Sequence, residues 1–248
     1  MCGPIMMRLL LVSCSLVLLL AVVGCRRGAQ NNANSGTGTG AGGGTSDGRA
    51  QARTLLEQGK TFYRNDQDSE AVEAFKQAVA MDPDLAEAHF RLGLSYEALN
   101  KQEDAESEFK KAVEAFKKMV EENPKDWEAH YLFGQTYASL QQYSDAIREY
   151  RQATKLKNDD ADIYYDLGTA HTKLAQYDEA ASAFSKSLEI DPDNYRAEDA
   201  LAEAREGVKR IRAGRKHQED LLKKQKEDEL KKAGEGLPTP PKPPVKGA

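Results

Sequence analysis

Small and aromatic residues recur along the middle of the chain with a period of about 34 residues. When Pro83 is placed at position 32 of such a unit, the unit begins at Ala52, and three more begin at Ala86, Trp127 and Ala161. In every unit position 8 is Gly, position 20 is Ala and position 24 is Phe or Tyr, while position 11 is aromatic or His. A repeat of this length predicts a stack of identical supersecondary units rather than one irregular core.

The spacing within a unit predicts two helices packed closely together. Gly at position 8 and Ala at position 20 remove side-chain bulk where the helices cross, and the rings at positions 11 and 24 fill the space beside them. The segment Asp82-Pro83-Asp84 predicts the end of one unit, because Pro cannot continue a helix and Asp84 can cap the next one.

This register resembles the tetratricopeptide repeat (TPR) over roughly residues 52–194. The resemblance implies an all-α fold, a right-handed superhelical solenoid of about four helix-turn-helix repeats with a C-terminal capping helix. We predict repeats at 51–85, 86–126, 127–160 and 161–194, and a capping and charged helix at 195–232.

The second unit departs from the period because its Pro124 falls seven residues late. Its second helix, from Glu103 to about Glu121, keeps an apolar stripe throughout, so about two turns of helix are added in phase. We predict a local protrusion there. The third unit ends without Pro, which predicts a softer turn.

The N-terminus has the features of an export signal. Residues 9–23 form an uncharged apolar run after Arg8, shorter than the roughly 20 residues that span a bilayer. Val22-Val23-Gly24-Cys25 resembles a bacterial lipobox, which implies cleavage after residue 24 and acylation of Cys25, and the following Arg26 is compatible with outer-membrane sorting. Cys14 is a weaker acceptor because too few apolar residues precede it, and translation from Met6 or Met7 would give a tidier signal. An uncleaved signal anchor is the alternative.

The two ends of the remaining chain differ in composition. Residues 25–50 are rich in Gly, Asn, Ser and Thr and predict a flexible tether, while 233–248 are Pro-rich and predict a disordered tail. From Arg205 onward the chain has 13 Lys and Arg against 7 Asp and Glu, whereas the repeats are acidic. We expect weak attraction to anionic lipid or cell-wall polymer, and no nucleic-acid partner.

The inventory of reactive side chains predicts no enzyme. All three Cys lie at or before residue 25, and His89, His130 and His171 occupy packing positions 4 and 11 of their units. We find no metal-ligand spacing and no phosphate loop. We therefore expect no catalytic residues, no metal, no cofactor and no small-molecule substrate.

A groove for a protein or peptide partner is the remaining candidate site. In the family, positions 2, 5, 9 and 12 of the first helix line the concave face, and a column of large side chains there suits a bound helix or extended peptide. The predicted groove residues are Leu56, Lys60, Tyr63, Arg64, Phe90, Leu94, Tyr131, Gln135, Tyr165 and Thr169. The Lys and Asn set with which some family members clamp a C-terminal carboxylate is missing.

Together these features predict a membrane-tethered scaffold that mediates protein–protein interactions in the assembly of a cell-envelope complex, as a pilus, secretin or outer-membrane assembly factor. Acyl chains on Cys25 would place it at the outer membrane, facing the periplasm. The alternative is an unlipidated periplasmic or membrane-anchored structural subunit of a larger envelope machine.

Overall fold

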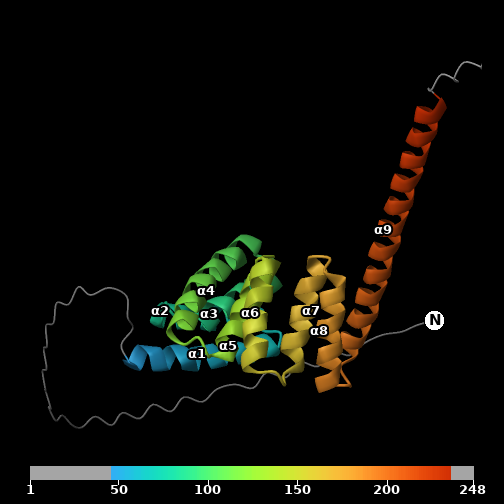
Figure 1. Cartoon of the computed structure of the whole chain (residues 1–248). Helices are drawn as coiled ribbons and strands as arrows, with labels where there is room; N and C mark the ends of the chain where they lie inside the picture. The colour runs from blue at the N-terminus through green and yellow to red at the C-terminus, as the bar shows by residue number, and fades with distance from the viewer. Residues whose placement is uncertain (1–45, 236–248) are drawn as a thin grey trace, which may run out of the picture. The chain divides into compact units, whose positions relative to one another are not determined.

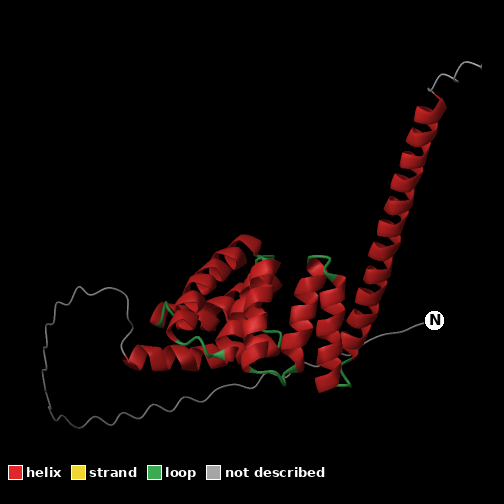
Figure 2. Ribbon diagram, in the orientation of Figure 1, coloured by secondary structure: helices red, strands yellow, loops and turns green. Residues whose placement is uncertain are grey.

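A computed structural model describes residues 46–235, which are helices joined by short turns, with no strand among them (Figure 2). The helices are α1 (Ser46–Arg64), α2 (Asp68–Met81), α3 (Ala86–Ala98), α4 (Gln102–Glu122), α5 (Trp127–Ser139), α6 (Tyr143–Leu156), α7 (Ala161–Lys173), α8 (Tyr177–Ile190) and α9 (Tyr195–Glu235). The predicted signal, Cys25 and residues 236–248 of the predicted tail lie outside the described residues, whereas residues 233–235, predicted to begin that tail, instead end α9. Residues 46–50, predicted to end the tether, instead form the first turn of α1.

The helices pack as successive antiparallel pairs (Figure 1). α1 pairs with α2, α3 with α4, α5 with α6, and α7 with α8, and each second helix also contacts the first helix of the next pair. α9 packs against α8 in the way that a fifth first helix would. The prediction of an all-α solenoid of four helix pairs with a capping helix is confirmed.

The glycine at position 8 is required by the ring at position 24. A Cβ atom added to Gly134 would lie 2.6 Å from two ring carbons of Tyr150, and one added to Gly93 would lie 2.5 Å from Phe109. Tyr150 in turn packs against the ring of Tyr131 at position 5, with 6.0 Å between ring centroids. The close approach of the two helices in each pair therefore depends on the ring at position 24 packing directly against the backbone of the glycine at position 8.

Each first helix ends in the same turn. Position 15 of all four units has a left-handed backbone, at Asp66, Asn100, Gln141 and Ala175. The amide of the following residue then donates to the carbonyl of position 11, as from Lys101 to Tyr96 at 2.8 Å. This six-to-one bond is the Schellman motif, which satisfies carbonyls that a helix end leaves free.

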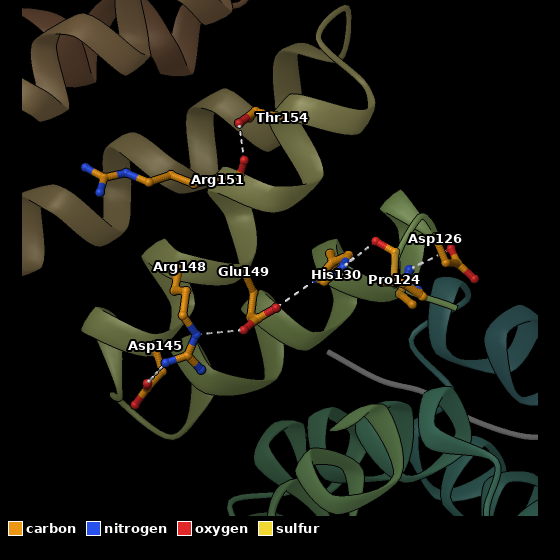
Figure 3. Close-up of polar contacts among 9 residues, drawn as sticks. Pro124, Asp126, His130, Asp145, Arg148, Glu149, Arg151 and Thr154 are labelled. Carbon is orange, nitrogen blue, oxygen red and sulfur yellow. Dashed lines mark hydrogen bonds and ion pairs between the residues drawn. The ribbon is translucent and has the colours of Figure 1, made fainter. Parts of the chain in front are cut away.

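Two histidines attach the turns between units to the second helix of the next pair. His130 places Nδ1 at 2.8 Å from Oε2 of Glu149 and Nε2 at 3.2 Å from the carbonyl oxygen of Pro124 (Figure 3). His89 makes the same contacts with Glu108 at 2.7 Å and with the carbonyl of Pro83 at 3.0 Å. Both rings are buried, as their packing positions predicted.

The prediction that Asp84 caps the next helix is wrong. The N-cap of α3 is Leu85, without a side-chain bond, and the amide of Asp84 donates to the carboxylate of Asp82 within the turn. Before α5, by contrast, a side-chain cap is present, since the carboxylate of Asp126 accepts from the amide of Ala129 at 3.1 Å.

α4 has 21 residues, against 14 in α2, α6 and α8. The added turns are not a bare protrusion, because Phe116 is buried and stacks on Phe133 of α5 with centroids 5.9 Å apart. Met119 and Val120 pack against the same cluster. The apolar stripe of the extension is therefore used inside the solenoid.

α9 continues beyond the repeats as one helix (Figure 1). Gly207 approaches the ring of Tyr177, and Arg212 pairs with Asp178 at 3.3 Å, but the side chains from Lys209 to Lys232 are exposed. Among the helices of residues 46–235, none has the length and apolar character needed to cross a bilayer.

Candidate partner-binding groove

The first helices of neighbouring pairs contact one another. α1 contacts α3, α3 contacts α5, α5 contacts α7, and α7 contacts α9. A cavity of about 300 Å³ is lined by residues of α3, α5 and α7, together with Tyr143 and Tyr150 of α6. Its lining residues are Phe90, Arg91, Leu94, Gln135, Ala138, Ser139, Tyr143, Tyr150, Asp166, Thr169 and Ala170. Larger hollows occur elsewhere, but their walls do not combine three successive first helices.

Four of the predicted groove residues line this cavity: Phe90, Leu94, Gln135 and Thr169. Phe90 is only 2% exposed, because its ring packs against Phe109 with centroids 6.0 Å apart, so it offers a floor rather than a protruding side chain. Leu56 is 5% exposed and belongs to the core of the first pair. It is therefore not available to a partner.

The two predicted tyrosines at position 5 are half-buried. Tyr131 donates its hydroxyl to Oδ2 of Asp166 at 2.9 Å, which joins α5 to α7. Tyr165 packs on Phe184 and is covered by the guanidinium of Arg196, 4.6 Å from the ring centroid. Both rings therefore connect helices, and neither lines the cavity.

A small polar network forms one wall of the cavity. Gln135 donates through Nε2 to Oδ2 of Asp166 at 3.0 Å and to the hydroxyl of Tyr131 at 2.9 Å. Burial raises the pKa of Asp166, and the hydrogen bonds from Gln135 and Tyr131 offset only part of that effect. Burial, followed by the charge of Asp166, raises the pKa of Tyr131, so its hydroxyl remains a donor.

The predicted cations at the N-terminal end are engaged with acids or exposed. Lys60 pairs with Glu57 at 2.9 Å and with Glu87 at 3.2 Å. Burial alone would lower the pKa of Lys60, but these two carboxylates raise it overall. Arg64 is exposed at the end of α1, and Tyr63 is half-buried. None of these three residues lines the cavity.

Asp166 is the functional candidate that the sequence did not predict. It occupies position 6, whereas the family pattern pointed to positions 2, 5, 9 and 12. At 100° per residue position 6 lies about 60° from position 9 on a helix, so both belong to one face. A helical wheel drawn around position 9 would have included it.

The described residues contain no group of three or more His, Cys, Asp or Glu side chains placed to hold a metal ion. His171 is buried between Gln176, at 2.6 Å from Nδ1, and Arg151, at 3.5 Å from Nε2. Burial lowers the pKa of His171, and the charge of Arg151 lowers it further, against the hydrogen bond to Gln176. Its contacts are those of a packed neutral histidine.

Comparison with protein families agrees with the repeat geometry. Family profiles described as TPR repeat or tetratricopeptide repeat match residues 59–100 and 134–175, 86–125, 115–148, and 161–194. Together these matches run without a gap over more than half of the chain. The chain belongs to the tetratricopeptide-repeat family.

The solved structures to which this TPR protein is similar include two crystal structures of MamA, each 26% identical to it. The matches cover 77% and 69% of this chain and 98% and 96% of the MamA chains, with TM-scores of 0.47 and 0.46. No curated protein matches this TPR protein in sequence.

Proposed function

We propose that this TPR protein is a membrane-tethered scaffold that holds a segment of another protein in the groove of α3, α5 and α7, in the assembly of a cell-envelope complex. The observation that supports the groove is the cavity lined by these helices, with an apolar floor of Phe90 and Leu94 and a polar wall of Gln135 and Asp166. Such a mixture of apolar surface and a few converging polar groups is typical of binding sites.

The membrane tether is supported by the sequence Val22-Val23-Gly24-Cys25 behind an apolar run. Acyl chains on Cys25 would confine the scaffold to a bilayer surface and raise the effective concentration of its partner there. An outer-membrane site facing the periplasm fits Arg26 after the acceptor. No catalytic step is part of this function.

The tether is tested by detergent phase separation of the full chain, expressed in a bacterium that processes lipoproteins. We expect the wild type in the detergent phase and Cys25→Ser in the aqueous phase, because the acyl chains supply the membrane affinity. Cys14→Ser is the matched control and should behave as wild type. If the wild type is recovered in the aqueous phase, or if Cys25→Ser remains in the detergent phase, the result would favour an unlipidated subunit instead.

The groove is tested by a block at Thr169, whose side chain lines the cavity. We expect Thr169→Trp to reduce the capture of the partner from envelope extracts at least tenfold, because the indole fills the space that the partner needs. Amounts of captured protein are compared by quantitative mass spectrometry, and helical content by circular dichroism.

Ser144→Trp provides the control for this block. Ser144 is exposed at the start of α6 and does not line the cavity, so the same bulky side chain should leave capture unchanged. If Thr169→Trp captures as much as wild type, the partner binds elsewhere, and the exposed part of α9 becomes the next surface to block.

A further inference from the structure

Within residues 46–235, Oδ1 of Asp166 in the cavity wall has no hydrogen-bond donor. Oδ2 of Asp166 accepts from both Tyr131 and Gln135, but Oδ1 accepts no hydrogen bond from residues 46–235, and Asp166 forms no ion pair with them. Asp166 nevertheless lines the cavity. A carboxylate held in this way is rigid on one side and open to a ligand on the other.

No cation of the described residues forms an ion pair with this carboxylate. Arg196 pairs with Asp162 at 3.2 Å and lies over the ring of Tyr165, and Arg91 pairs with Glu87 at 3.2 Å. The charge of Arg196 lowers the pKa of Asp166, but the charge of Asp162 raises it by more. A neutral or acidic partner that closed the cavity would bury a carboxylate without a counter-ion, which is strongly unfavourable.

We propose that the cavity is a recognition pocket for a lysine side chain of the partner segment, with Asp166 as the residue that binds its ammonium group. The inference rests on the proposed function of the groove. The apolar surfaces of Phe90 and Leu94 would cover the methylene stem, and the ammonium would donate to Oδ1 of Asp166. A cavity of about 300 Å³ is at the lower limit of ligand pockets and suits one long side chain.

The geometry favours lysine over arginine. A guanidinium binds best side-on, with one bond to each carboxylate oxygen, but Oδ2 of Asp166 already has two donors. An ammonium needs only the free oxygen. In this pocket a carboxylate of the protein would bind a cation of the partner. In the carboxylate clamp, whose Lys and Asn set is missing from this chain, the charges are the reverse.

The test selects peptides from a displayed library of random 12-residue sequences with the full chain as target. We expect the bound peptides to share a lysine next to apolar residues. Replacing that lysine by norleucine should weaken binding about 10- to 100-fold, measured by fluorescence anisotropy, which is the usual effect of losing a charge-assisted hydrogen bond.

The protein variants are Asp166→Asn and its control Asp199→Asn, which removes an exposed acid of α9 that does not line the cavity. Asp166→Asn should weaken binding of the lysine peptide as much as the replacement of its lysine by norleucine does. Combining the two replacements should weaken binding little further, because both remove the same contact. Asp199→Asn should change binding less than threefold.

The outcomes separate this inference from the proposed function. If the selected peptides lack a shared lysine, or if Asp166→Asn binds them as tightly as wild type, the lysine pocket is overturned. The groove itself still stands in that case, provided that Thr169→Trp abolishes binding. If no peptide is selected, or if Thr169→Trp binds normally, the groove is not a partner site and both proposals fail.

Discussion

Replacing Gly134 with Val is expected to lower the free energy of unfolding by about 3 kcal/mol, at the upper end of the usual effect of overpacking. A Cβ atom at this position would lie 2.6 Å from Cδ1 and Cε1 of Tyr150. Tyr150 is 2% exposed and is held on its other side by the ring of Tyr131, so it cannot turn away. The helices α5 and α6 must then separate, which exposes part of the core of the third pair. Urea denaturation followed by circular dichroism measures the loss.

The control is the same substitution at Gly214, in the exposed part of α9. No atom lies within 4 Å of a Cβ added there, so Gly214→Val should change the free energy of unfolding by less than about 0.5 kcal/mol. Equal losses at the two positions would show that flexibility rather than close approach accounts for Gly134.

The sequence predicted this close approach because each repeat carries the same evidence. A single Gly in a helix is ambiguous, but Gly at position 8 with Ala at position 20 and a ring at position 24 recurs in all four units. The repeated pattern of Gly, Ala and ring therefore predicts the contacts between the two helices of a pair. The fold follows from that pattern without any knowledge of the contacts of individual residues.

The groove could be predicted only in part because its walls come from different units. Position 5 was expected to present exposed rings, but Phe90 packs against Phe109 inside its own pair, which the period alone does not show. Asp166 acquires its role from Tyr131 and Gln135, which lie on the preceding first helix. Contacts between units depend on the twist from one unit to the next, and a sequence period does not specify that twist.

The partners of the buried histidines were also missed, although the sequence contains a signal for them. His89 and Glu108 are 19 residues apart, as are His130 and Glu149, and each histidine follows a proline by six residues. The fourth unit, which no proline precedes, has Tyr164 in place of the histidine. The co-occurrence of Pro, His and Glu in two units indicates one structural device rather than three independent residues.

Because of these Pro–His–Glu contacts, Glu149→Ala is expected to cause the second large loss in the free energy of unfolding. Glu149 is 6% exposed and bonds to Nδ1 of His130 at 2.8 Å and to Nε of Arg148 at 3.0 Å. Without it, a buried ring nitrogen of His130 has no partner, and leaving a buried polar group unsatisfied typically costs about 1 to 3 kcal/mol. Urea denaturation should show this loss, while Glu114→Ala on the exposed face of α4 should change stability by less than about 0.5 kcal/mol.

A double-mutant cycle with His130→Ala distinguishes the pair from two separate packing losses. Glu149 and the carbonyl of Pro124 contact opposite nitrogens of the same ring, so the loss of His130 removes the partner of both. Once His130 is absent, the buried Glu149 has lost its bond to that ring. In the His130→Ala background, Glu149→Ala should therefore lower the free energy of unfolding by at least about 1.5 kcal/mol less than it does in the wild type. Strictly additive losses would mean that the two side chains do not stabilise each other. The attachment of the turn at Pro124 to α6 would then have to come from the packing of α5 alone.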